Sequence, residues 1–170
     1  MKVNNSIIIM NYELLTTNFF YMREPSIFEK IVAGEIPSTK IRENDEFLAI
    51  LDVFPNCKWQ TLVIPKQRYD SDVSLMPDDV YSRYMLATKE VITILKKWLW
   101  VQRVWVIMEW MWVHHAHVKL YPMYGLWDEW QAIEVKEKKR FDTYEWYLTT
   151  HMGEFKGKDE LDWVAKEILS

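Results

Sequence analysis

A short run in the second half of the chain places nitrogen-bearing side chains at every second position. His115, His117 and Lys119 alternate with small or aliphatic residues. Neighbouring side chains of a β-strand point to opposite faces, so the spacing predicts that these three share one face while the aliphatic residues enter the core. Side chains two positions apart lie roughly 6.5–7 Å from each other along a strand, a reach that suits one phosphoryl group. The run therefore predicts a site for a phosphate-containing ligand.

The elements that carry this run are predicted to form an α+β fold. An antiparallel sheet of about five strands packs against one long helix and a short N-terminal helix. Strand candidates are runs rich in β-branched, aromatic or aliphatic residues, separated by turn residues such as the pair Asn44-Asp45. The candidates are Lys40–Glu43, Glu46–Val53, Thr61–Pro65, Arg103–Met108 and His115–Tyr121.

Capping residues and apolar spacing predict the helices. Ser26 can cap a short helix that ends near Gly34. The longest helix is predicted to begin at Pro77, because two acidic residues follow it, and its apolar positions recur at helical spacing as far as Lys97. A final helix is predicted over Asp159–Leu169.

The composition limits the class of protein. With 49% hydrophobic and 27% charged residues, the 170-residue chain is predicted to fold around one core. Its formal net charge of −4 disfavours a nucleic-acid binder. No run approaches the roughly 20 apolar residues that span a bilayer, so no membrane partner is expected either. Cys57 is the only cysteine, which excludes an internal disulfide and fits the reducing cytoplasm.

The chain divides into three expected parts. Residues 1–22 are interpreted as an N-terminal extension, with Met22 as an alternative translation start. Residues 23–150 are predicted to form the domain. Residues 151–170 are expected to be a C-terminal tail that contains the last helix.

The tryptophans occupy positions that favour glycine. The chain has ten Trp and four Gly, the reverse of ordinary usage. Trp98 follows the last residues of the long helix, where a left-handed glycine is expected, and Trp59 lies in a turn. We hypothesise that the native host reads the codon UGA as glycine at several of these positions; the alternative is a protein that uses Trp in its core and on its surface. The candidates are Trp59, Trp98, Trp100, Trp105, Trp110, Trp112 and Trp146.

Three ordered segments resemble the histidine triad (HIT) family. The family's motif is His-x-His-x-His followed by apolar residues, and this chain has His115-x-His117-x-Lys119. Residues 26–31 followed by 35–37 are similar to the family's opening helix, with the sequence Ser-Ile-Phe-Glu-Lys-Ile and then Glu-Ile-Pro. Asp52-x-x-Pro55 followed by residues 61–66, Thr-Leu-Val-Ile-Pro-Lys, resembles its second signature. The resemblance covers residues 24–150.

The chain departs from the family pattern at three positions. Lys119 replaces the third histidine, and Gln60 replaces a histidine that often precedes the Thr-Leu-Val-Ile-Pro segment. Trp59 stands where the family commonly has glycine. The first two changes imply a slower or different enzyme, and the third agrees with the recoding hypothesis.

The resemblance implies that His117 is the nucleophile. It would attack the α-phosphorus and give a transient nucleotidyl-histidine, with its other ring nitrogen held by a backbone carbonyl in the same strand. His115 would support the phosphate pocket. Lys119 would bind phosphate, since a lysine keeps its positive charge but is a poor proton donor near neutral pH.

The resemblance also implies a nucleotide-binding set. An acidic side chain would bond the ribose hydroxyls, and aliphatic and aromatic residues would sandwich the base. The link that leads into the last strand would place backbone N–H groups near the phosphate, where glycine allows close approach and two indoles would fill the pocket. The residues are Ile27, Phe28, Ile31, Asp52, Val53, Gln60, Trp110 and Trp112.

The sequence thus predicts a cytoplasmic nucleotide hydrolase, homodimeric as family members usually are and without a cofactor. Its substrate would be a nucleoside phosphoramidate, an adenylate ester or a dinucleoside polyphosphate. The alternatives are a nucleotide-binding module with little turnover and a nucleotidyltransferase. No metal is expected: a zinc site at His115 and His117 would need further ligands, and only Cys57, His114 and His151 are spare.

Overall fold

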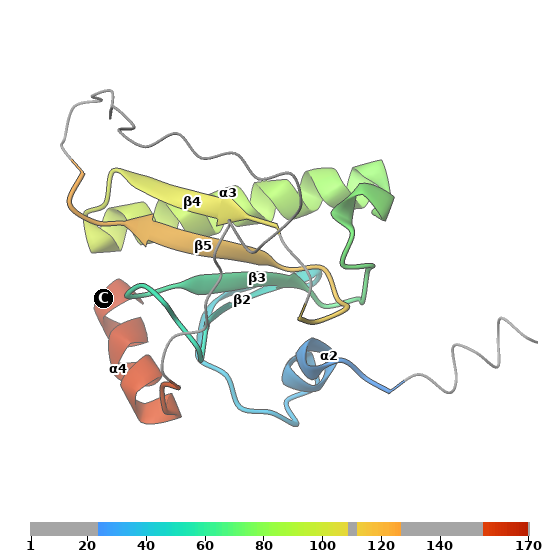
Figure 1. The fold of residues 1–170 in the computed structure, drawn as a ribbon, viewed down its shortest axis with the longest axis horizontal. Coiled ribbons are helices and arrows are strands. Elements are labelled where there is room, and N and C mark those ends of the chain that lie inside the picture. The colour runs from blue at the N-terminus through green and yellow to red at the C-terminus, as the bar shows by residue number, and fades with distance from the viewer. Residues whose placement is uncertain (1–23, 109–111, 127–154, 170) are drawn as a thin grey trace, which may run out of the picture.

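The computed structural model describes residues 24–108, 112–126 and 155–169. Its five strands form one antiparallel sheet in the order β1-β2-β3-β5-β4, so the predicted α+β fold is confirmed (Figure 1). The expected extension at residues 1–22 lies outside the described residues. The strands are β1 Lys40–Glu43, β2 Phe47–Leu51, β3 Thr61–Pro65, β4 Arg103–Ile107 and β5 Val118–Met123.

The strand that carries the nitrogen-bearing run begins later than the sequence predicts. β5 starts at Val118, which pairs with Val63 of β3, so His115 and His117 lie in the segment that leads into the strand. The reason lies in the backbone hydrogen bonds before β5: the His115 N–H donates to a carbonyl two residues earlier, and the Ala116 N–H donates to the Tyr69 carbonyl. Neither amide is available to the sheet ladder.

One face of the sheet packs against the long helix α3, Asp78–Leu99. Tyr84 is fully buried in this helix, and its hydroxyl donates to the Val63 carbonyl at 2.6 Å. The C-terminal helix α4, Lys158–Leu169, joins the same core, where Thr39 donates to Asp162 at 2.7 Å. The inward residues include Ala49, Leu51, Val63, Val91, Leu95, Val118, Leu120, Leu161, Ala165 and Ile168.

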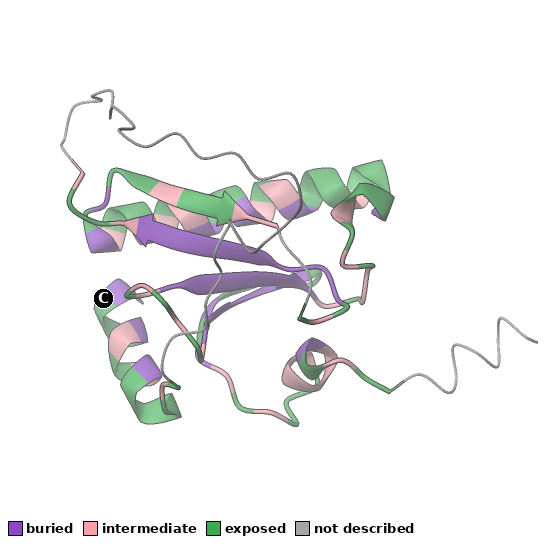
Figure 2. Ribbon diagram, viewed as in Figure 1, coloured by how far each residue is buried: buried purple, intermediate pink, exposed green. Residues whose placement is uncertain are grey.

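The opposite face of the sheet carries a second, smaller core around the short helix α2, Ile27–Val32. Phe28 packs there with Leu48, Ile50, Leu62 and Ile64. In Figure 2 the central strands are buried and β4 at the edge is largely exposed. The buried central strands therefore form one wall of any cavity that lies between the sheet and α2.

The helix ends show where the chain requires a left-handed residue. α3 begins after Pro77 with two acidic residues, as predicted, but it continues to Leu99, so Trp98 lies inside the helix and the expectation of a left-handed residue there is wrong. The left-handed position is Trp100, with φ 54° and ψ 35°. Within the described residues, no helix combines the length and the apolar character that a membrane crossing requires.

Positive φ values occur only at glycine and tryptophan among the described residues. The two glycines are Gly34 and Gly125, and the two tryptophans are Trp59 and Trp100. A side chain with a Cβ clashes in this conformation, at a cost of roughly 1–2 kcal/mol per residue. Both tryptophans belong to the set that the sequence singled out.

Candidate active site

His117 is buried in the segment that leads into β5, with 2% of its surface exposed. Its Nδ1–H donates to the His115 carbonyl at 2.9 Å, and because a carbonyl only accepts, the neutral ring carries its lone pair on Nε2. The pKa of His117 is lowered from 6.5 to about 4, mainly by burial; the hydrogen bond to the His115 carbonyl opposes this shift, and the charge of Lys119 adds to it. The ring is therefore uncharged at neutral pH and has a nucleophilic nitrogen.

A cavity of about 310 Å³ lies between α2, the ends of β2 and β3, and β5. The structure brings most of the predicted site together in its wall: Ile27, Phe28, Ile31, Asp52, Val53, Gln60, Trp112, His117 and Lys119. Sequence reasoning missed further wall residues, namely Ile36, Pro37, Ser38, Ile50, Leu51, Phe54, Leu62 and Val113. Of these, only Ile36, Pro37 and Leu62 had a signal, because they belong to segments that resemble the family.

The apolar part of this cavity surrounds the imidazole. The ring of Phe28 meets the ring of His117 edge-on, with centroids 5.0 Å apart and planes at 62°. Ile27 and Ile31 extend the same wall from α2, and Val53 continues it from the end of β2. Walls of this kind exclude water and can take a flat aromatic group, as most small-molecule sites do.

Lys119 brings a positive charge into the cavity. It follows His117 by two residues, lies in β5 opposite Leu62 of β3, and is only 9% exposed. In the part of the chain that the structure describes, no carboxylate forms an ion pair with its ammonium group. An isolated buried cation is costly, so a cavity of this kind favours an anionic ligand.

Asp52 and Gln60 close the loop that joins β2 to β3. Gln60 Nε2 donates to Asp52 Oδ2 at 2.6 Å, and the Asp52 N–H donates to the Gln60 carbonyl at 3.0 Å. Asp52 Oδ1 accepts from the Phe54 N–H, and Gln60 Oε1 accepts from the Asn56 N–H. The carboxylate is thus fixed at the cavity wall, and each oxygen has a second lone pair for a ligand hydroxyl.

His115 does not line the cavity, although the sequence predicted that it shares a surface with His117. Its ring is fully buried: Nε2–H donates to the Pro65 carbonyl at 2.9 Å, and Nδ1 accepts from the Ser26 hydroxyl at 2.8 Å. The turn before β5 rotates this side chain toward α2 and away from the cavity. The support that the sequence predicted for the phosphate pocket stays a prediction, and it would act through the segment that also carries His117.

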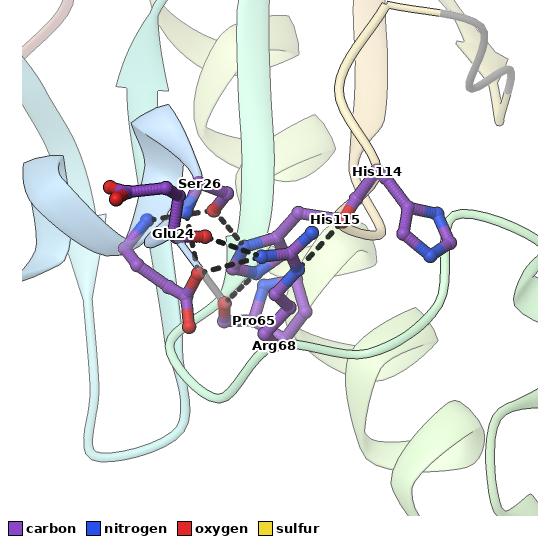
Figure 3. Close-up of polar contacts among 7 residues, drawn as sticks. Glu24, Ser26, Pro65, Arg68, His114 and His115 are labelled. Carbon is purple, nitrogen blue, oxygen red and sulfur yellow. Dashed lines mark hydrogen bonds and ion pairs between the residues drawn. The ribbon is translucent and has the colours of Figure 1, made fainter. Parts of the chain in front are cut away.

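Ser26, Glu29, Arg68 and His115 form one hydrogen-bonded cluster, which we call the clasp (Figure 3). The Ser26 hydroxyl accepts from the Glu29 N–H at 3.1 Å, and Glu29 accepts from the Ser26 N–H at 2.7 Å, a reciprocal cap that fixes the start of α2. Arg68 donates to Glu29 at 3.2 Å and to the His114 carbonyl at 2.8 Å. The clasp joins α2 to the segment that carries His117. The spacing Ser26-x-x-Glu29 was the signal for its cap; nothing local indicated Arg68.

The tryptophans of the link before β5 differ from expectation. Trp112 lies in the wall of the cavity of about 310 Å³, and 62% of its surface is exposed. The sequence predicted that this indole would fill the pocket, and it does not. The side chain extends into solvent from the rim. Trp110 lies outside the described residues.

Metal ligands do not gather in the described part of the chain, where no three His, Cys, Asp or Glu side chains form a cluster that could hold an ion. Both ring nitrogens of His115 are engaged in the clasp. His114 is exposed and bonds a serine hydroxyl. Burial raises the pKa of Cys57 to about 11, which keeps its thiol protonated. His151 lies outside the described residues.

The chain is similar in sequence or in fold to several known proteins. An uncharacterized HIT-like protein of Methanocaldococcus jannaschii is 41% identical over 71 residues, which are 42% of this chain and 54% of that protein. The adenylylsulfatase HINT1 of Arabidopsis thaliana is 48% identical over 44 residues, 26% of this chain and 30% of that protein. A HIT-like protein of Bartonella henselae, described as involved in cell-cycle regulation, has a TM-score of 0.63 at 22% identity; the match covers 86% of this chain and 95% of that one.

The length of chain that each match covers decides whether family membership is shown. The chain spans about half the length of the first curated relatives that it matches. The family model described as HIT domain matches residues 33–123, more than half of the chain, and this range includes the cavity wall from Ile36 to Lys119. The protein therefore belongs to the HIT family.

Proposed function

We propose that the protein is a nucleotide hydrolase that works through a nucleotidyl intermediate on His117. One observation carries the proposal: a buried, uncharged imidazole and a buried lysine that no described carboxylate neutralises lie in the wall of one cavity. A neutral nitrogen can attack phosphorus, and the cation favours the negative charge that phosphorus chemistry brings. Substrates are nucleoside phosphoramidates, adenylate esters or dinucleoside polyphosphates.

The reaction has two steps. The Nε2 lone pair of His117 forms a bond to the α-phosphorus, and the bond from phosphorus to the leaving group breaks, with the electron pair going to the leaving group. Water then attacks the phosphorus, loses a proton to solvent, and returns the electron pair to Nε2. The Nδ1–H of His117 donates to the His115 carbonyl, with 2.9 Å between nitrogen and oxygen, so the carbonyl stabilises the positive ring of the intermediate.

The remaining wall residues suit the nucleoside. A cavity of about 310 Å³ lies at the small end of the range for small-molecule sites. Phe28, Ile27 and Ile31 offer an apolar surface for the base, and nothing among them discriminates one purine from another. Asp52 supplies carboxylate lone pairs for the vicinal hydroxyls of ribose.

Trapping the intermediate tests this function. Protein mixed with an α-³²P-labelled adenylate and denatured without acid should carry label on His117, whereas His117→Ala should carry none and release no nucleotide. Thermal unfolding of the variant controls for folding. Label that persists in His117→Ala would refute the proposal.

Two alternatives predict different outcomes of the same experiment. A nucleotide-binding module binds nucleotide tightly but forms no covalent intermediate, and Lys119 as a buried cation is the feature that favours it. A nucleotidyltransferase forms the labelled intermediate but discharges it faster to an added phosphate or sugar phosphate than to water. The acceptor dependence of label loss separates transfer from hydrolysis.

We also propose that the protein acts as a homodimer, as the family resemblance implies. β4 lies at the edge of the sheet, and its Trp105 and Val106 are exposed. An exposed apolar edge strand suits association with a second copy. Light scattering coupled to gel filtration should give twice the mass of the 20.7 kDa chain. A monomer at micromolar concentration would contradict this assembly.

A further inference from the structure

We propose that Lys119 restricts the enzyme to nucleotides whose leaving group departs as a stable anion, such as sulfate, in preference to an amine; this inference rests on the proposed function. The first reason is the set of groups around the reacting phosphorus. The polar side chains of the described cavity wall are those of Ser38, Asp52, Gln60, Trp112, His117 and Lys119.

None of these groups is suited to give a proton to a leaving group near neutral pH. A general acid works best when its proton affinity matches the working pH, which is the range of histidine. His117 is the one histidine in the described wall, and it is consumed as the nucleophile while its Nδ1 proton is bound to the His115 carbonyl. Lysine holds its proton too tightly to be an efficient acid.

The second reason is what Lys119 does supply. Lys119 is 9% exposed, lines the same cavity as His117, and has no described carboxylate as an ion-pair partner. A buried cation stabilises charge that develops as the bond to phosphorus breaks, and this effect is strong where water is excluded. Negative leaving groups benefit in full, since they gain a charge and need no proton.

The two classes of leaving group differ in their proton balance. When the P–O bond of an adenylyl sulfate breaks, sulfate takes the electron pair and departs as a dianion with no proton transfer. When the P–N bond of a phosphoramidate breaks, the nitrogen must gain a proton to leave as ammonia or an amine. The described wall therefore serves the first reaction and lacks a donor for the second.

A comparison of two substrates on three proteins tests the proposal. Wild type should turn over adenylyl sulfate with a kcat/KM about 10²-fold above that for adenosine 5′-phosphoramidate, because a missing general acid costs about that much. Lys119→His restores an acid and should raise the phosphoramidate value about tenfold or more, which narrows the ratio. Lys119→Gln removes the charge without adding an acid. The kcat/KM values for both substrates should therefore fall, and the value for the phosphoramidate should not rise.

The outcomes separate this inference from the function on which it rests. If label appears on His117 but wild type prefers the phosphoramidate, or if Lys119→His leaves the ratio unchanged, the role of Lys119 is wrong while the nucleotidyl-histidine stands. If neither substrate labels His117, the hydrolase function fails and this inference fails with it. Thermal unfolding of both variants controls for loss of structure.

The backbone carries a second and independent inference: we infer that residues 59 and 100 are glycine in the protein as its own host makes it. Trp59 and Trp100 have φ 58° and 54°, the conformation that Gly34 and Gly125 adopt in the same structure. Trp100 is 91% exposed, so little packing compensates its strain. The Trp59 indole has a buried Nε1 without a hydrogen-bond partner among the described residues.

The other candidates lack this support. Trp98 lies within α3 and Trp105 within β4, where the backbone is ordinary for any residue. Trp112 is at the cavity rim without a positive φ. Trp110 and Trp146 lie outside the described residues. The geometry therefore selects two positions from the seven that the sequence offered.

Mass spectrometry of peptides from the host's own protein tests this inference directly, and glycine is expected at both positions. Tryptophan at either position would overturn it there. In recombinant protein, Trp100→Gly should raise the midpoint of thermal unfolding by roughly 2–8 °C, because the left-handed strain is released. Trp163→Gly is the matched control: Trp163 is also exposed but lies in α4, where glycine should lower the midpoint. A lower midpoint for Trp100→Gly would count against the strain on which the inference depends.

Discussion

His115 and His117 are two residues apart, yet they occupy regions of opposite character. In the clasp, the buried ring of His115 has a hydrogen bond at each nitrogen, and Arg68 joins the surrounding groups to a carboxylate. In the cavity, Lys119 is buried without a described carboxylate, and the wall is mostly apolar. The polar groups of the clasp are hydrogen-bonded within the protein, whereas the charge of Lys119 in the cavity is available to a ligand. This difference in surroundings distinguishes His115 from His117, which we propose to be the nucleophile, more sharply than the shared motif does.

The largest effect is expected from a change to His117 in the cavity. His117→Ala removes the only imidazole in the described cavity wall and should lower kcat/KM by about 10³-fold or more, as the loss of a nucleophile does. Rapid-quench kinetics with an adenylate substrate measures it. A residual rate within tenfold of wild type would show that the comparison assigns the wrong histidine.

Loosening the clasp should have an intermediate effect on turnover. Ser26→Ala removes the hydroxyl that bonds His115 and caps α2, so His117 and the Phe28 wall should lose their alignment. We expect kcat to fall by about 10- to 100-fold with a smaller change in KM, because small misplacements of reacting groups are costly. Steady-state kinetics checks this split.

A matched serine controls for the clasp. Ser71 also bonds a histidine, His114, at 2.9 Å, but this pair is exposed. Ser71→Ala should leave kcat unchanged. Ser26→Thr keeps the hydroxyl and should restore much of the rate, a rescue that a mere loss of packing would not produce. Equal effects of Ser26→Ala and Ser71→Ala would mean that the clasp does not position the site.

The cavity histidine should also make stability depend on pH. The pKa of His117 is about 4 in the folded protein, below its ordinary value of 6.5. Between these values the unfolded chain binds a proton that the folded protein does not, so the free energy of unfolding falls as the pH is lowered from 6.5 toward 4. From pH 7 to pH 5 this group should remove about 2 kcal/mol.

Urea unfolding at the two pH values measures this effect. The amide of His117→Asn can still donate to the His115 carbonyl. Between pH 7 and pH 5, the free energy of unfolding of this variant should fall by about 2 kcal/mol less than that of wild type. An identical loss in both proteins would show that His117 is already protonated or accessible in the folded state.

The smallest expected effect concerns the loop that closes the cavity. Gln60→Ala removes the bonds to Asp52 and to the Asn56 N–H, so the free energy of unfolding should fall by about 1–2 kcal/mol. KM should rise several-fold while kcat changes little, because Asp52 loses its fixed position. Gln67→Ala, at an exposed position after β3, is the control and should change neither value.

The comparison also shows how far local patterns reach. The alternation of residues 115–120 correctly placed Ala116, Val118 and Leu120 in the core beneath α3, because side-chain direction along an extended chain repeats every two residues. It failed at His115, whose ring is held by hydrogen bonds to Ser26 and the Pro65 carbonyl outside the cavity wall. The same limit applies to the end of α3, which the sequence placed near Trp98 and the structure places at Leu99.

The sequence by itself determined the fold class, the capped start of α2, the strands around the cavity and the membership of the HIT family. These follow from periodicity, capping residues and short motifs, which depend on neighbours a few positions apart. The tertiary structure alone decided that Ser26 and Pro65 enclose His115, that Lys119 is buried without a described counter-charge, and that Trp59 and Trp100 take the left-handed conformation. Such features depend on contacts between residues far apart in the chain, or on where the packed core forces the backbone to turn, and neither leaves a local signal.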